Sequence, residues 1–280
     1  MQFDLGLAWS DGVGKVRDNF QLLAIVAGVF MFLPSAIFTI AAPDLMAAAS
    51  GAGMNPQDPT AILKLFTPMV IIGYLVMTIL STVGYTAMIA LMHHDQKLTV
   101  GEAITRGFRA LPTLLGVFVL FFIAYILAAV VVGVVVGLLV AGLGAISGAL
   151  AGIVTFVLVV GLFVAILWVF ARLSMIMPVV AIEGVTNPVT VLKRSWSMTG
   201  PAQWRLLGFY VLLFVAYMVI ALLVFGLLGV VVSAAGGIAI LGILSSLLGM
   251  VVAMFFSGIL AAVHRQLSGS SGESLTDTFG

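Results

Sequence analysis

The residue whose type and position most strongly suggest chemistry is Arg172, a cation inside a long apolar run. A cation at mid-bilayer costs roughly 2.5–3.5 kcal/mol on insertion scales, so such a residue by default indicates a function. An arginine near the end of a span can instead extend its guanidinium to the headgroup region. The sequence leaves both interpretations open. It offers Glu102 and Glu183 as candidate partners for Arg172, and Glu183 is also within reach of Lys193.

A short cationic segment that is rich in tryptophan follows Arg172. Indole rings prefer the headgroup zone of a bilayer, and neighbouring basic side chains favour contact with anionic lipids. With a tryptophan near the N-terminus, these residues make up the lipid-facing set that we expect: Trp9, Lys193, Arg194, Trp196, Trp204 and Arg205.

Other polar patterns give no support for catalysis. His93 and His94 precede Asp95, but adjacent histidines point in different directions on a helix and no third ligand follows at helical spacing. The chain has no cysteine, no phosphate-cradling glycine loop and no paired carboxylates inside an apolar run. We therefore expect no metal, no cofactor and no enzymatic activity.

The composition indicates an integral membrane protein. Apolar residues make up 63% of the chain and charged residues only 8%, whereas soluble domains carry about a quarter charged residues. The apolar runs are continuous and reach 18 residues or more, which is typical of membrane helices rather than barrel strands. A net charge of +1 gives no support for nucleic-acid binding.

We predict an all-α membrane fold with six transmembrane helices. Proline at positions 34, 68 and 178 is expected to kink three of them. Most Lys and Arg residues fall in the segments before span one, between spans two and three, between spans four and five, and after span six, which places both termini in the cytoplasm. The predicted spans are 21–41, 62–92, 114–140, 149–182, 206–233 and 238–263.

An internal repeat organises these spans. Residues 114–125 read LLGVFVLFFIAY and residues 206–217 read LLGFYVLLFVAY, an offset of 92 residues. The offset predicts three parallel units, at about 5–92, 97–184 and 189–266, each a two-span hairpin preceded by an amphipathic helix in the cytoplasmic interface. These units form a single domain, 1–266, and a flexible cytoplasmic tail follows over 267–280. The same offset aligns Arg172 with His264 at the end of span six, which favours a position near the membrane boundary.

Three parts of the sequence carry a resemblance to a known family: RLSMIMPVVAIEG from Arg172, VLKRSWSMTG from Val191 and WRLLG from Trp204. They resemble the membrane domain associated with bacterial glycerophosphoryl diester phosphodiesterases, and are similar to uncharacterised YciC-like inner-membrane proteins. The resemblance implies a location in the bacterial inner membrane. It transfers no phosphodiesterase activity, because that chemistry belongs to a separate soluble barrel and no position here matches its catalytic residues.

These observations predict a non-enzymatic membrane module of the bacterial envelope that interacts with lipids or acts as a scaffold. Its expected partners are membrane lipids, anionic ones included, together with another membrane protein or further copies of the chain. The alternative is a small permease or flippase for an anionic or lipid-like substrate that passes between the hairpins, with Arg172 in contact with that substrate.

Overall fold

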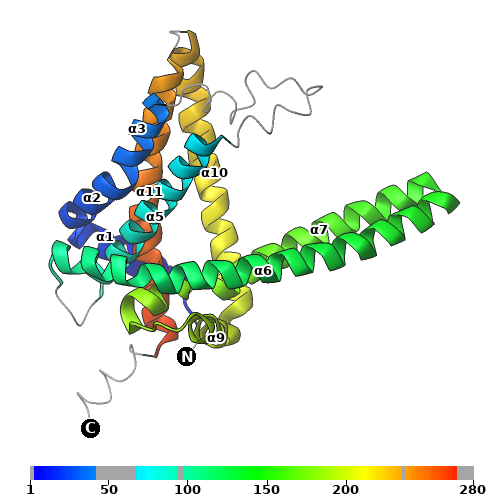
Figure 1. The fold of residues 1–280 in the computed structure, drawn as a ribbon, viewed down its shortest axis with the longest axis horizontal. Coiled ribbons are helices and arrows are strands. Elements are labelled where there is room, and N and C mark those ends of the chain that lie inside the picture. The colour runs from blue at the N-terminus through cyan, green and yellow to red at the C-terminus, as the bar shows by residue number, and fades with distance from the viewer. Residues whose placement is uncertain (1–2, 42–66, 94–97, 235–236, 270–280) are drawn as a thin grey trace.

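The computed structural model describes residues 3–41, 67–93, 98–234 and 237–269, and every regular element among them is a helix (Figure 1). Most of the predicted tail, the connection between the first two predicted spans and the His94–Asp95 part of the histidine motif lie outside the described residues. Six helical segments are long and apolar enough to cross a membrane, as the sequence predicted. They are Phe20–Ala41, Val70–Leu91, Val100–Gly144, Gly148–Glu183, Pro188–Gly226 and Ile240–Leu267.

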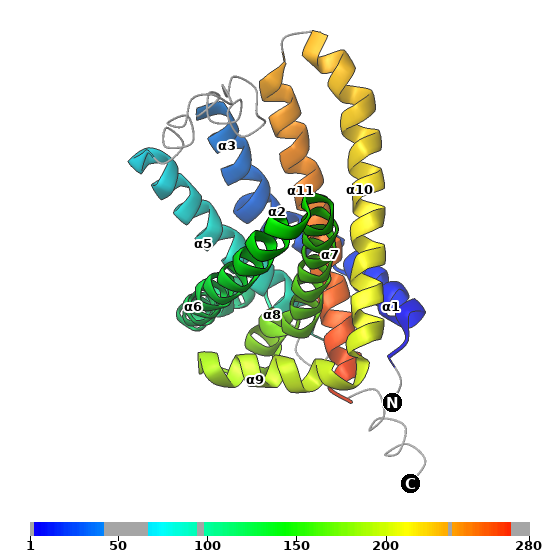
Figure 2. The ribbon, with the colours of Figure 1, turned by 90° about the vertical axis from the view of Figure 1, so that its right-hand side faces the viewer.

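Four of these segments stand together as a bundle (Figures 1 and 2). The first consists of α2 (Phe20–Ala27), a π-helical segment η1 (Gly28–Phe32) and α3 (Leu33–Ala41). The others are α5 (Pro68–Leu91), α10 (Gln203–Ala234) and α11 (Ile238–Leu267). Pro34 is the second residue of α3, one position beyond the residue that follows η1, so a π-bulge accompanies the proline where a kink was predicted. Pro68 is different, because it occupies the first turn of α5 after the N-cap Thr67 and kinks nothing.

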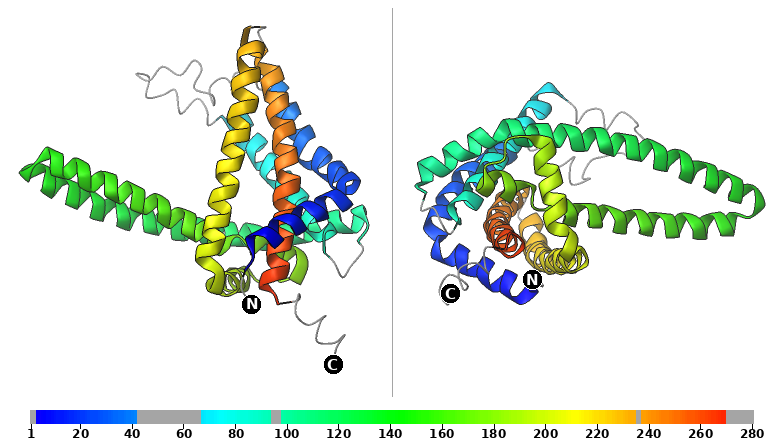
Figure 3. Two further views of the ribbon diagram at one scale, coloured as in Figure 1. Left: turned by 180° about the vertical axis from the view of Figure 1, so that it is seen from behind. Right: turned by 90° about the horizontal axis from the view of Figure 1, so that it is seen from below.

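The remaining two segments form a long hairpin that projects sideways from the bundle (Figures 1 and 3). Helix α6 (Val100–Ile146) runs for 47 residues, and α7 (Gly148–Leu173) returns after a break at Ser147. A capping box starts α6: the Thr99 hydroxyl accepts from the Glu102 amide, and Glu102 Oε2 lies 2.8 Å from the Thr99 amide. The predicted amphipathic helix and span three are thus one helix, which continues through Pro112.

The predicted fourth span, 149–182, also differs from the structure. Helix α7 ends at Leu173, and after a turn the chain forms α8 (Ile176–Pro178) and the π-helical segment η3 (Val179–Glu183). Gly184 ends η3 in the left-handed conformation with a φ of 69°, which glycine adopts at no steric cost. The polar end of this span therefore turns back under the bundle instead of extending α7.

Two short helices flank the spans at the end of the bundle where both termini lie (Figures 2 and 3). Helix α1 (Leu5–Asp18) crosses α11, and α9 (Pro188–Thr199) leads through a 3-10 turn, η4 (Gly200–Ala202), into α10. The two amphipathic helices predicted at 5–20 and near 189–196 are therefore separate elements, unlike the one at the start of α6. Because the three units are built differently, the threefold repeat stays a prediction.

Candidate functional site

The cations that the structure describes gather at one end of the molecule. The elements that carry them are α1, the first turns of α6, the last turn of α7, α9, the start of α10 and the end of α11, which meet beside the two termini (Figures 1, 2 and 3). We call this region the cationic end. It contains all nine Lys and Arg residues of the described chain: Lys15, Arg17, Arg106, Arg109, Arg172, Lys193, Arg194, Arg205 and Arg265.

Arg172 is buried at this end, with only 7% of its surface exposed. Its guanidinium carbon lies 4.3 Å from the ring centroid of Trp196 and 5.9 Å from that of Trp168. The two indoles meet edge to face with their centroids 5.3 Å apart. A cation over indole faces is attracted by their negative quadrupoles, and the attraction strengthens where water is excluded.

The backbone of Arg172 is fixed as firmly as its side chain. Its carbonyl oxygen accepts hydrogen bonds from the hydroxyls of Ser195 and Thr199, each at 3.0 Å. The guanidinium tip fills the space beside Gly200, which caps the C-terminus of α9, where the helix dipole favours positive charge. Arg172 therefore joins the end of α7 to α9, and it forms no ion pair with a described residue.

The carboxylates predicted as partners of Arg172 have other roles. Glu183 Oε2 lies 3.0 Å from Arg194 Nε, and Glu183 Oε1 lies 3.0 Å from Nε2 of the buried His264. Glu183 thus ties η3 to α9 and α11, whereas Glu102 caps α6. Among the described residues neither carboxylate forms an ion pair with Arg172, and the polar site of Arg172, Glu183 and Glu102 stays a prediction.

The predicted lipid-facing residues divide into two groups. Trp9, Trp196 and Trp204 expose 49%, 39% and 65% of their surfaces, and Lys193 is exposed as well. The two arginines are engaged in the fold: Arg194 pairs with Glu183, and Arg205 Nη1 donates to the carbonyl of Phe3 at 3.4 Å. The exposed members come from α1, α9 and α10, so three elements present aromatic or cationic groups at the cationic end.

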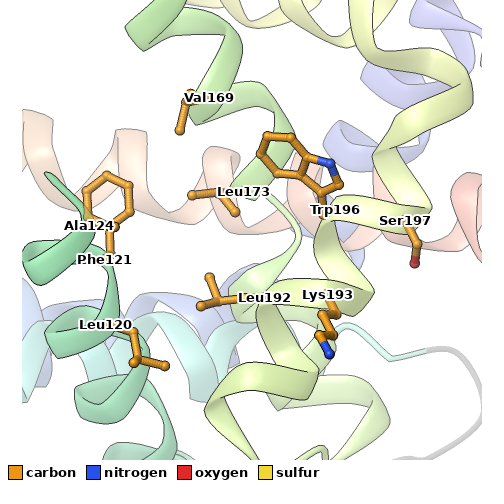
Figure 4. A pocket seen from close by; sticks show the side chains of 9 residues that line it. All are labelled: Leu120, Phe121, Ala124, Val169, Leu173, Leu192, Lys193, Trp196 and Ser197. Carbon is orange, nitrogen blue, oxygen red and sulfur yellow. The ribbon is translucent and has the colours of Figure 1, made fainter. Parts of the chain in front are cut away.

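The sequence did not predict a groove of about 480 Å³ between the root of the hairpin and α9 (Figure 4). In the sequence, the groove residues on α6 and α7 cannot be distinguished from the other apolar residues of the spans. Only the fold brings α9 against them. The groove is lined by Leu120, Phe121 and Ala124 of α6, Val169 and Leu173 of α7, and Leu192, Lys193, Trp196 and Ser197 of α9.

Metal ligation has no visible basis in the part of the chain that the structure describes, where no three His, Asp or Glu side chains gather.

Comparison with known proteins gives one match. No curated protein and no solved structure matches the chain, and nothing found links it to glycerophosphoryl diester phosphodiesterases or to YciC-like proteins. The resemblance in the sequence thus receives no support from relatives. A family match does extend from α1 to the end of α11, over residues 4–267. The chain belongs to the family defined by the domain of unknown function DUF7847.

Proposed function

We propose that the protein is a multi-pass module of the bacterial inner membrane that interacts with lipids through its cationic end and has no catalytic site of its own. One observation carries the proposal: exposed tryptophans and all nine described cations belong to elements that meet at the same end of a bundle of apolar helices. Indole rings favour the headgroup zone, and each Lys or Arg near an anionic leaflet contributes about 1 kcal/mol to membrane attraction.

The orientation follows from the same charges. Cytoplasmic segments of membrane proteins carry an excess of Lys and Arg, so the cationic end faces the cytoplasm and both termini lie on that side. In this orientation α1 and α9 lie in the cytoplasmic interface, as the predicted threefold repeat requires. Trp9 on α1 and Trp196 on α9, both exposed, support this placement.

The proposal includes a scaffolding role, in which the partners are another membrane protein or further copies of the chain.

The transport alternative receives less support. Arg172, which that alternative would place against an anionic substrate, contacts Trp168 and Trp196 instead and does not line the groove. The groove itself has mainly apolar walls, and the polar residues among those that line it are Lys193 and Ser197.

The test is native mass spectrometry of the purified protein after equilibration with equal amounts of phosphatidylglycerol and phosphatidylcholine. We expect retention of phosphatidylglycerol over phosphatidylcholine, and a loss of that preference in a triple variant that neutralises three exposed cations: Arg17→Gln, Arg109→Gln and Lys193→Gln. As a control of opposite charge, Asp18→Asn should keep or increase the preference. Equal retention of the two lipids by the wild type would count against the proposal.

A further inference from the structure

The groove has three walls that differ in origin. One comes from the α6 limb of the hairpin at Phe121, the second from the α7 limb at Leu173, and the third from α9 at Leu192 and Trp196 (Figure 4). Its volume of about 480 Å³ lies within the range of about 300–1,000 Å³ that ligand sites occupy. An open groove with walls of this composition suits a hydrocarbon chain.

Two polar residues line the groove, Lys193 and Ser197. Of these, Ser197 is hydrogen-bonded within the described structure and Lys193 is not. Ser197 lies at the edge, and its hydroxyl donates to the Arg194 carbonyl at 2.9 Å. Lys193 is exposed and has no hydrogen bond or ion pair with any described residue. Figure 4 shows its ammonium pointing away from the apolar walls, toward the outside of the groove. The groove therefore combines an apolar interior with one free positive charge at its rim.

The walls are held in place by contacts behind them. Arg172 stacks on Trp196 and hydrogen-bonds to α9 through its carbonyl, so the α9 wall and the α7 wall are fixed to each other. On the α6 side, a Cβ added to Gly116 would meet Pro188 Cγ at 2.6 Å, so α9 approaches α6 as closely as a glycine allows. A site that exists before its ligand arrives avoids much of the ordering cost of binding.

We propose that this groove takes the hydrocarbon chain of an anionic phospholipid, with its phosphate on the Lys193 ammonium. The inference rests on the proposed function and deepens it, because it names one lipid class and one site within the cationic end. The free cation at the rim complements the negative headgroup, and Arg172 acts as a positioning residue that holds the Trp196 wall.

The experiment uses fluorescence quenching by phospholipids with brominated chains. A variant with Trp9→Phe, Trp168→Phe and Trp204→Phe leaves Trp196 as the reporter in the groove, and a second variant that keeps only Trp9 reports on the general interface. Each is placed in vesicles of phosphatidylcholine with a small fraction of brominated phosphatidylglycerol or brominated phosphatidylcholine. If the loss of Trp168 prevents folding, the variant that keeps both Trp168 and Trp196 takes its place.

We expect phosphatidylglycerol to associate with the Trp196 site about fivefold more strongly than phosphatidylcholine, the effect of one cation near a lipid headgroup. Lys193→Gln should remove this difference, and the matched change of an exposed cation outside the groove, Arg17→Gln, should not. Equal quenching by the two lipids, or quenching of Trp196 at the level of random lipid contact, would overturn the inference. If Trp9 still prefers phosphatidylglycerol in that case, the proposed function survives; if neither reporter shows a preference, both fail.

Discussion

At position 172 a buried positive charge is compensated without a carboxylate. The sequence offered a functional cation or one that extends to the headgroups, and both interpretations stay predictions. In the structure the guanidinium stacks on Trp196 beside the end of α9. Burial of an arginine without an ion pair is costly, and indole faces and a helix C-terminus offset part of that cost. No spacing rule links residues 172 and 196, so this contact was beyond prediction from the sequence.

We predict that the negative charge of Glu183 stabilises the fold. Its carboxylate bridges Arg194 and His264, and about one fifth of its side chain is exposed. Glu183→Gln keeps the shape but removes the charge from both contacts, and should cost about 1–2 kcal/mol because charge-assisted hydrogen bonds are lost. Thermal unfolding in detergent, followed by helical circular dichroism, should show a lower Tm.

Asp18→Asn, which changes an exposed carboxylate without described partners, should leave the Tm nearly unchanged. Equal Tm values for the two variants would show that the bridge contributes nothing to stability.

Among the elements, the crossing of α1 and α11 depends on two glycines. A Cβ at Gly258 would lie 2.6 Å from Val16 Cγ2 and 2.7 Å from the Gly12 carbonyl oxygen, which is backbone and has little freedom to move. Gly258→Ala should therefore push the two helices apart at a cost of about 1–3 kcal/mol.

Gly249 on the same helix provides the matched control. No atom lies within 4 Å of a Cβ at that position, so Gly249→Ala should be neutral or should stabilise the helix by about 0.5–1 kcal/mol. The measurement is again the Tm in detergent. A Gly258→Ala protein as stable as the Gly249→Ala protein would mean that the α1–α11 crossing is loose.

Local sequence signals predicted the existence of the helices but not how they are joined. Apolar length was sufficient to predict the spans, and the start of α6 lies in the segment for which an amphipathic helix was predicted. The joints depend on contacts between distant residues, such as the Thr113 hydroxyl, which donates to the Thr186 carbonyl at 2.9 Å. The groove is built on such joints, so it was not predictable, although Lys193 and Trp196 at its edge were singled out by residue type.

At the scale of the molecule, hydropathy predicted six spanning segments, and the described residues contain six helical segments of adequate length and apolarity. The clustering of the described cations at one end also agrees with the alternation of connections rich and poor in Lys and Arg along the chain. The sideways course of the α6–α7 hairpin was not predicted (Figure 3). Its side chains are apolar and largely exposed, so hydrophobicity alone sets no direction for it relative to the bundle.

The central claim is that the cationic end lies among lipid headgroups. The most direct test is an experimental structure of the protein in a bilayer that contains phosphatidylglycerol. We expect headgroup density level with Trp9 and Trp204, with one lipid phosphate beside Lys193 and the chain of that lipid between Phe121 and Trp196. A structure with the cationic end buried against protein or standing clear of the headgroup layer would contradict it.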